Sequence, residues 1–286
     1  MEVIGVIAKP SRENTRNVLE TLLPWLRQRT RTILMDKDTA ATVQEASPLS
    51  RSEVAQEAQL MLVLGGDGTF LSVARVIGER GTPILGVNLG SLGFLTEITL
   101  EDLYPTLEKV LAGDYRVEER LMLSAVLSGR DLDATHRLAL NDVVINKGAL
   151  ARIIHLETHI NQQFVTTFRA DGLIVATPTG STAYSLAAGG PIVYPTMDAL
   201  VLSPICPHTV TNRPLVLPGD CVVEITLKTP SENVMVTLDG QVGFPIQHED
   251  TLKVQRAQSR IRVVQPYRKN YFGILRTKLK WGEGPP

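Results

Sequence analysis

The sequence lacks the features that mark secreted, membrane-spanning or nucleic-acid-binding proteins. Its 286 residues include only two cysteines, Cys206 and Cys221, which are too few for a disulfide framework. The formal net charge is −1, so the basic surplus that attracts nucleic acid or an anionic membrane is missing. The start, MEVIGVIAKP, has no secretory-signal pattern, and apolar runs such as Leu60–Leu64 are far shorter than the roughly 20 residues of a membrane span. We therefore expect a soluble, cytoplasmic protein with no nucleic-acid and no membrane partner.

The first third of the chain has the pattern of an α/β domain. Short apolar runs alternate with amphipathic segments, as in folds whose helices connect parallel strands. The run Leu60–Leu64 is apolar throughout, which is typical of a strand buried on both faces. The pattern predicts a Rossmann-like parallel sheet, with the polar segment Ala41–Ser52 as a loop. The expected strands are Val3–Ala8, Thr32–Asp36, Leu60–Leu64 and Pro83–Asn88, and the expected helices are Thr15–Arg29, Phe70–Glu79 and Leu100–Ala112.

The rest of the chain has the pattern of an all-β domain. After about Glu118, strand-like runs follow one another at short intervals with turn residues between them. Tyr271–Trp281 again has a helical pattern, and we expect it to return to the first domain. The predicted division is an α/β domain at 1–118 with 270–286, and a β-rich domain at 119–269. The expected strands are Met122–Leu127, Arg137–Ile145, Arg152–Ile160, Gln163–Arg169, Leu173–Thr177, Cys221–Leu227, Val234–Leu238 and Ile261–Val264.

The stretch LVLGGDGTFL, from Leu62 to Leu71, raises the first question of function. A glycine loop between a strand and a helix usually cradles phosphate with neutral backbone N–H groups, yet Asp67 stands at its centre. The stretch fails the dinucleotide fingerprint G-x-G-x-x-G, and the chain contains no P-loop and no G-x-S-x-G sequence. Two interpretations stay open: Asp67 handles a proton or a metal in phosphoryl transfer, or it caps the following helix.

Two further clusters combine a predicted strand with residues suited to binding. Gly86–Leu95, GVNLGSLGFL, directly follows a strand, and in an open α/β sheet it would face the same crevice as the first glycine loop. Leu140–Asn146 begins with an Asn-Asp pair that suits the amide edge of a base and two ribose hydroxyls. Taken alone, each cluster also reads as an ordinary turn.

The segment Ala170–Pro191 leads from a strand into a hydroxyl-rich loop and a short helix. We expect Ser181 or Thr182 near the N-cap of that helix, where hydroxyl and amide donors would meet a ribose or a phosphate. Tyr184 would be positioned to stack on a base. The alternative is a plain capped helix with Tyr184 in the core.

One alternating trio, His155, Glu157 and His159, lies in a predicted strand and so shares one face of it. Such a face can ligate a metal, but no further ligand clusters with the three in the sequence. A polar outer face of the strand is the favoured interpretation.

Taken together, these motifs resemble the NAD kinase family in its bacterial form. The resemblance rests on the order GGDGT, NLGSLGFL, ND, ADG, TPTGSTAYSLAAGGPI and PICPHTVTNRPLVLP, from about Val63 to Gln241. GGDGT alone is less specific, since diacylglycerol and sphingoid kinases and phosphofructokinases carry similar loops. The resemblance implies ATP-dependent phosphorylation of the 2′-hydroxyl of the adenosine ribose of NAD, giving NADP, with a divalent metal cation, Mg²⁺ or Mn²⁺.

The resemblance also implies roles for individual residues. Asp67 matches the proton acceptor of the family, and Asp142 stands where many relatives have Glu. Asp171 matches the residue at the nicotinamide end. Family members are homo-oligomers, commonly dimers or tetramers, in which a neighbouring subunit completes the NAD site. The implied NAD-binding residues are Asp67, Gly68, Asn141, Asp142, Arg152, Arg169, Asp171, Thr182, Ala183, Tyr184, Ser185, Leu186, Ala187 and Gln241.

Two other functions compete with this one. A lipid or sphingoid kinase would share the GGDGT loop, but it would need an apolar substrate pocket or a basic membrane-facing patch, and neither is visible in the sequence. A non-catalytic dinucleotide sensor would use the same clefts for binding only. The carboxylate at the loop centre argues against a sensor, because Gly or Ser would bind phosphate better there.

Overall fold

The computed structural model describes residues 1–10, 13–90, 92–128, 136–148, 152–230, 233–265 and 271–281. The chain divides into two compact units, one formed by 1–119 with 261–286 and the other by 120–260. Each unit has its own hydrophobic core. No helix in the described ranges has both the length and the apolar character needed to cross a bilayer.

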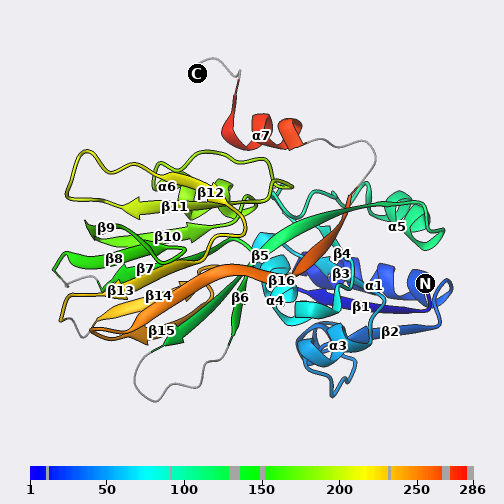
Figure 1. Cartoon of the computed structure of the whole chain (residues 1–286). Helices are drawn as coiled ribbons and strands as arrows, with labels where there is room; N and C mark the ends of the chain where they lie inside the picture. The colour runs from blue at the N-terminus through cyan, green and yellow to red at the C-terminus, as the bar shows by residue number, and fades with distance from the viewer. Residues whose placement is uncertain are drawn as a thin grey trace. The chain divides into compact units, whose positions relative to one another are not determined.

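The first unit is an α/β layer built on parallel strands (Figure 1). The strands follow the order β2, β1, β3, β4, with every neighbouring pair parallel. The end of β16 adds to β4, also in parallel, through Val263 and Ile84. The predicted parallel α/β domain is therefore confirmed. Its strands are β1 Val3–Ala8, β2 Thr32–Met35, β3 Leu60–Leu64 and β4 Ile84–Val87, and its helices are α1 Glu13–Arg27, α2 Lys37–Thr42, α3 Arg51–Glu57, α4 Asp67–Ile77, the 3₁₀ turn η1 Gly78–Arg80, α5 Leu103–Leu111 and α7 Tyr271–Leu279.

Helices cover both faces of this sheet. Leu19 and Leu22 of α1 and Leu107 of α5 pack in one core with alternate residues of β1 and β3. On the opposite face, Val54 of α3 lies over Gly5 of β1. All five residues of β3 are buried, as expected for a strand covered on both sides.

The second unit consists mainly of two antiparallel sheets whose inner faces share one core. One sheet has the order β12, β11, β10, β7, β14, β15, and the other includes β16, β13, β8 and β9. Inward-facing residues such as Val236 and Ile225 alternate with more exposed ones and fill the space between the sheets. The strands are β5 Arg116–Ser128, β6 Arg137–Ala139, β7 Asp142–Lys147, β8 Ile154–Ile160, β9 Gln163–Ala170, β10 Gly172–Ala176, β11 Ala199–Ile205, β12 Leu215–Pro218, β13 Val223–Leu227, β14 Val234–Leu238, β15 Val242–Ile246 and β16 Thr251–Gln265, with η2 Gly180–Thr182 and α6 Tyr184–Ala187 as the helical turns.

The main differences from the sequence prediction are short elements. Within the segment expected to be a loop, Ala41–Ser52, residues 43–50 do form neither helix nor strand, but α2 extends into it to Thr42 and α3 begins in it at Arg51. Asp36 caps α2 by accepting the backbone N–H of Thr39, and Ser50 forms a capping box with Glu53 at the start of α3. The predicted strand Arg137–Ile145 is broken into β6 and β7. Strands β11, β12 and β15 were missed.

Candidate active site

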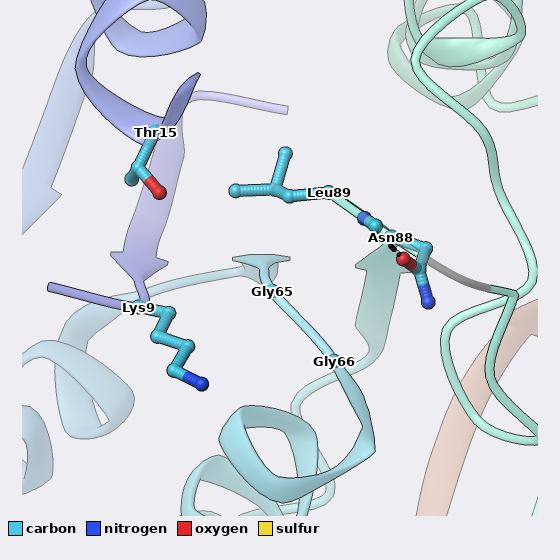
Figure 2. A pocket seen from close by; sticks show the side chains of 7 residues that line it. Lys9, Thr15, Gly65, Gly66, Asn88 and Leu89 are labelled. Atoms are coloured by element: carbon cyan, nitrogen blue, oxygen red, sulfur yellow. Dashed lines mark hydrogen bonds between the residues drawn. The ribbon is translucent and has the colours of Figure 1, made fainter. Parts of the chain in front are cut away.

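Three loops of the first unit meet where parallel strands end. Lys9 follows β1, Gly65 and Gly66 follow β3, and Asn88 begins the loop after β4. Together with Thr15 of α1 they surround a pocket of about 130 Å³, shown in Figure 2. The prediction that the two glycine loops face one crevice is confirmed, because Gly66 and Gly90 line the same pocket.

Asp67 does not cap α4. The N-cap is Gly66, Asp67 is the first helical residue, and α4 has no side-chain cap at this end. The carboxylate instead reaches the second glycine loop, where its Oδ2 accepts the N–H of Phe94 at 2.8 Å. Its Oδ1 accepts the N–H of Leu95 at 3.0 Å and both the N–H and the hydroxyl of Thr96 at 3.1 Å. The helix-cap interpretation is therefore wrong.

The distribution of these bonds leaves the two oxygens of Asp67 unequal. A carboxylate offers about four lone-pair positions, two on each oxygen. From the residues that the structure describes, Oδ1 receives three donors, whereas Oδ2 receives one, from Phe94. Oδ2 therefore keeps room to accept one more proton donor, such as a substrate hydroxyl.

The close approach of the second loop depends on Gly93. A β-carbon at Gly93 would lie 2.1 Å from Asp67 Oδ1 and 2.4 Å from the hydroxyl oxygen of Thr96. Asn88 supports the same arrangement, since its Nδ2 donates to Thr96 Oγ1 at 3.0 Å. Thus the NLGSLGFL stretch serves to hold the GGDG carboxylate in one orientation. Gly68, the adjoining predicted contact, is exposed.

In the second unit, the Asn141–Asp142 pair lies at the corner where β7 begins. The carboxylate of Asp239, which follows β14, accepts the backbone N–H groups of Leu140, Asn141 and Asp142 at 3.2, 2.7 and 3.3 Å. From the other side, Thr177 donates its hydroxyl to Leu140 O at 2.6 Å and its N–H to Asn141 O at 2.9 Å. The corner is thus held by both neighbouring strands.

Asp142 is almost fully buried, with 3% of its surface exposed. Burial, and secondly the nearby charge of Asp239, raise the pKa of the Asp142 carboxyl to about 7. The group therefore exists in both protonation states near neutral pH. The ionised form accepts hydrogen bonds from two hydroxyls, and the neutral form can donate one.

The loop Thr177–Ala187 leaves β10 at this same end of the sheet, because Ala176 pairs with Asp142. Ser181 is buried, and its hydroxyl donates to Pro178 O at 2.7 Å and accepts the N–H of Val193 at 2.9 Å, so it caps no helix. The N-cap of α6 is Ala183, so Thr182 lies next to it as predicted, but the helix has no side-chain cap, and the Thr182 hydroxyl donates to Thr179 O. This loop provides the six predicted contacts Thr182, Ala183, Tyr184, Ser185, Leu186 and Ala187.

The side chains of that loop differ in exposure. Tyr184 is 42% exposed, so its ring is open to a ligand and the core alternative is wrong. Ser185 is buried and hydrogen-bonded to the hydroxyl of Ser203 at 3.0 Å. Gln241, in the turn after β14, is exposed at the same end of the sheet.

The remaining predicted site residues lie elsewhere in this unit. Asp171 immediately precedes β10, and its carboxylate is 3.3 Å from the ammonium of Lys147 at the far end of β7. Five residues along a strand correspond to about 17 Å, so Asp171 and Asp142 are separated by the length of β7. Arg169 is the penultimate residue of β9, Arg152 lies two residues before β8, and both side chains are exposed. Within the second unit, the predicted site residues therefore lie in two separate groups rather than one.

Several residues with a part in these sites were not identified from the sequence. Asp239 stands in an Asp-Gly pair, which has the pattern of an ordinary turn, and its position two residues before Gln241 was the usable signal. Thr177 and Thr96 were read as parts of their motifs without a role. Lys9 and Thr15 lie outside all of the sequence motifs described above. The position of Lys9 directly after the first strand was the only signal for it.

The described part of the chain contains no group of three His, Cys, Asp or Glu side chains arranged to hold a metal ion. The trio His155, Glu157 and His159 occupies the more exposed face of β8. Glu157 is 3.7 Å from the ammonium of Lys228, and the ring of His159 packs edge-on against Phe164. The polar-face interpretation is confirmed.

Comparison with known proteins bears on both units. Residues 4–115 match a family described as the ATP-NAD kinase N-terminal domain, and residues 140–266 match the ATP-NAD kinase C-terminal domain. The curated NAD kinase of Geotalea daltonii is 52% identical and that of Trichlorobacter lovleyi 51% identical, each covering 99% of this chain and 100% of the relative.

Solved structures agree with this family. Yeast NADH kinase in complex with NADH has a TM-score of 0.92 at 26% identity, covering 100% of this chain and 89% of that chain. The NAD kinase of Archaeoglobus fulgidus in complex with ATP shares the fold, with a TM-score of 0.76 at 23% identity, covering 97% of this chain and 98% of that chain.

Proposed function

The chain belongs to the NAD kinase family and is a phosphotransferase that converts NAD to NADP, and we propose that Asp67 is its catalytic base. Asp67 accepts the proton of the 2′-hydroxyl of the adenosine ribose while that oxygen attacks the γ-phosphorus of ATP. The bond from the γ-phosphorus to the bridging oxygen breaks, and ADP leaves. The observation that carries the proposal is the unequal bonding of Asp67, whose Oδ2 has one donor while Oδ1 has three.

The competing functions are not favoured. The curated relatives at about half identity over the full chain are named NAD kinase, not lipid or sphingoid kinase. The sensor interpretation assigned no role to the carboxylate of Asp67.

Binding of the dinucleotide is proposed for the second unit. Asn141 and Asp142 hold adenine and ribose groups, with Asp142 accepting ribose hydroxyls in its ionised form. The loop from Thr182 to Ala187 lines the nucleotide, Tyr184 stacking on a base, and Gln241 adds a contact at the same end of the sheet. Support comes from the corner geometry, because β10 and β14 bring this loop and this turn to the start of β7.

A divalent cation, Mg²⁺ or Mn²⁺, accompanies the phosphoryl donor in this proposal. Such ions are bound through one or two carboxylates together with substrate phosphates and water, rather than by a protein cage. The described residues fit that mode, since the carboxylate of Asp67 directly follows Gly66 of the glycine-lined pocket and no three-ligand cluster is present among them. The metal would supply charge neutralisation on the phosphates.

Self-association, as a dimer or tetramer, is part of the proposal. Arg152, Arg169 and Asp171 bind the dinucleotide from a neighbouring subunit. The separation of Asp171 from Asp142 by the length of β7 supports this division. Mixing inactive Asp142→Asn and Asp171→Asn proteins tests it, since a shared site restores activity in the mixed oligomer. If the mixture stays inactive although exchange of subunits is demonstrated, both residues act within one subunit.

We also propose that the protein works in the cytoplasm. Cys206 and Cys221 are both free thiols, as is usual in a reducing compartment. Fractionation of the source cells tests this assignment.

The catalytic assignment is tested with purified protein, NAD, ATP and Mg²⁺, using an NADP-specific dehydrogenase to detect the product. Asp67→Asn is expected to lower kcat by about 10²–10⁴-fold, which is the usual contribution of a general base to the rate, while the affinity for NAD is unchanged. Asp38→Asn is the matched control, because Asp38 is an exposed acid in the first turn of α2. Wild-type kcat in Asp67→Asn would remove Asp67 from the role of base.

A further inference from the structure

The pocket in Figure 2 lies at the point of the sheet where strand order reverses. The chain leaves β1 for β2 on one side, and β3 lies on the other side of β1. Loops that leave neighbouring parallel strands in opposite directions open a crevice at the carboxyl ends, and ligands of α/β proteins bind there. The strand ends are joined by hydrogen bonds from Lys9 N to Leu64 O and from Gly65 N to Val87 O, both 2.9 Å.

The pocket has the composition of an anion site. Among the residues that the structure describes, those that line it include one cation and no acid, and they are Lys9, Thr15, Gly65, Gly66, Asn88, Leu89 and Gly90. Three of them are glycines, so backbone amides can approach a ligand closely. A volume of about 130 Å³ is several times what a single water molecule requires. Gly66 is also the residue from which α4 begins, so the positive end of that helix borders the pocket.

Thr15 provides an independent observation. Its side chain is fully buried, and its hydroxyl has no hydrogen-bond partner in the described part of the chain. An unsatisfied buried hydroxyl is unfavourable unless a ligand supplies the partner. Figure 2 shows the hydroxyl oxygen directed toward the space between Lys9 and Leu89. The side chain of Lys9, which also lines the pocket, is exposed, and in Figure 2 it points away from Thr15.

We propose that Lys9 and Thr15 bind the phosphoanhydride chain of the phosphoryl donor in this pocket. Lys9 supplies the positive charge and Thr15 donates its hydroxyl to a phosphate oxygen, while Gly65, Gly66 and Gly90 present their backbone. The ligand is a phosphate chain, carried by a nucleoside triphosphate or present as inorganic polyphosphate. This inference rests on the proposed function, because it assigns the donor side of the same reaction.

The test compares Lys9→Met, which keeps the length and removes the charge, with Lys37→Met. Lys37 is the first residue of α2, two positions after the end of β2; it is exposed and does not line the pocket. Lys9→Met is expected to raise the KM for ATP at least tenfold and to change the KM for NAD less than twofold. Calorimetric titration with tripolyphosphate is expected to show a similar loss of affinity. Lys37→Met should match the wild type in all three measurements.

The hydroxyl is tested with Thr15→Val, which keeps the shape, and Thr15→Ser, which keeps the hydroxyl. Thr15→Val is expected to raise the KM for ATP severalfold, and Thr15→Ser to stay close to the wild type. Equal effects of Val and Ser on the KM for ATP would assign Thr15 to packing alone and overturn its part in the proposal.

These measurements treat the two sources of the phosphate chain, ATP and tripolyphosphate, separately. They also separate the pocket assignment from the proposed function. A parallel loss for ATP and tripolyphosphate in Lys9→Met supports a site for the phosphate chain. A loss for ATP alone, or wild-type affinity for both, overturns it. If the wild-type protein forms no NADP, the proposed function fails, whereas the tripolyphosphate titration of wild type and Lys9→Met still decides the pocket assignment.

Discussion

The carboxylate of Asp239 accepts the backbone N–H of Asn141 at 2.7 Å, across 98 positions of sequence. The same side chain accepts the neighbouring N–H groups of Leu140 and Asp142. In return, the N–H of Asp239 donates to Asp142 O at 3.0 Å. The turn after β14 therefore fixes the backbone from which both predicted adenosine-binding side chains project.

Asp239→Asn should weaken this support without removing the turn. Asp239 has a φ of 51°, a left-handed conformation that Asn tolerates well. The amide keeps one acceptor but turns a donor toward a backbone N–H, so we expect a loss of about 1–3 kcal/mol in unfolding free energy. The KM for NAD should rise about tenfold, the equivalent of ~1.4 kcal/mol. Denaturation and steady-state kinetics measure both, with Asp220→Asn, an exposed turn residue, as the control.

The raised pKa of Asp142 predicts that the stability of the protein depends on pH. Its pKa is about 7 in the folded protein against 3.8 as the unperturbed value. Between these values the folded state retains a proton that the unfolded state has released, so the unfolding free energy falls as pH rises through this window. At about 1.4 kcal/mol per pKa unit, the total loss amounts to at most ~4 kcal/mol above pH 7.

Asp142→Asn should remove that loss, because an amide does not titrate. We expect the variant to gain stability relative to the wild type at pH 8, with the difference shrinking toward pH 4, while the affinity for NAD falls. Urea denaturation at pH 5, 6, 7 and 8 measures the difference. Parallel curves for the two proteins would contradict the burial argument.

Much of the fold followed from local pattern, and the exceptions have physical causes. β1 and β3 were predicted to the residue because an uninterrupted apolar run has few alternatives. Helices α2 and α3 have 6 and 7 residues, which is too short for a helical repeat of apolar residues to be recognised in the sequence. They depend on the caps Asp36 and Ser50. The break between β6 and β7 depends on Asp239, a contact between distant segments that local pattern does not contain.

The site was predictable in part for the same reason. Glycine clusters and the Asn-Asp pair are visible as local motifs, and they identified Asp67 and Asp142 as residues of interest. Which group each carboxylate contacts is a tertiary property, since Asp67 meets Thr96 across 29 positions. Ruling out the helix-cap interpretation of Asp67 therefore required the structure.

Thr96→Val should separate the support of Asp67 from its chemistry. Thr96 is fully buried, and its hydroxyl donates to Asp67 Oδ1 and accepts from Asn88 Nδ2. Losing both bonds is expected to cost about 1–3 kcal/mol of unfolding free energy. The decrease in kcat should be smaller than the decrease caused by Asp67→Asn, because three hydrogen bonds from backbone N–H groups still hold the carboxylate of Asp67.

The control for that variant is Thr82→Val. Thr82 is also buried in the first unit, but its hydroxyl makes only a long bond of 3.4 Å to Ala58 O. We expect its loss to cost less than about 1 kcal/mol. If the two threonine variants show the same loss of unfolding free energy and the same decrease in kcat, the hydrogen bond from Thr96 to Asp67 contributes no more to either than the long bond of Thr82.

Gly180→Ala tests whether the nucleotide loop and the Asn-Asp corner act as one packed unit. A β-carbon at Gly180 would lie 2.0 Å from Asn141 O and 2.7 Å from its Cα, and backbone atoms cannot rotate away as a side chain would. The corner or the loop must shift, so we expect a loss of about 1–3 kcal/mol in unfolding free energy and a raised KM for NAD. Gly243→Ala is the matched control in the same unit, because its nearest neighbour would lie at 3.4 Å, an ordinary contact. Wild-type KM and stability in Gly180→Ala would mean that the corner tolerates displacement and that its hydrogen bonds do not determine NAD binding.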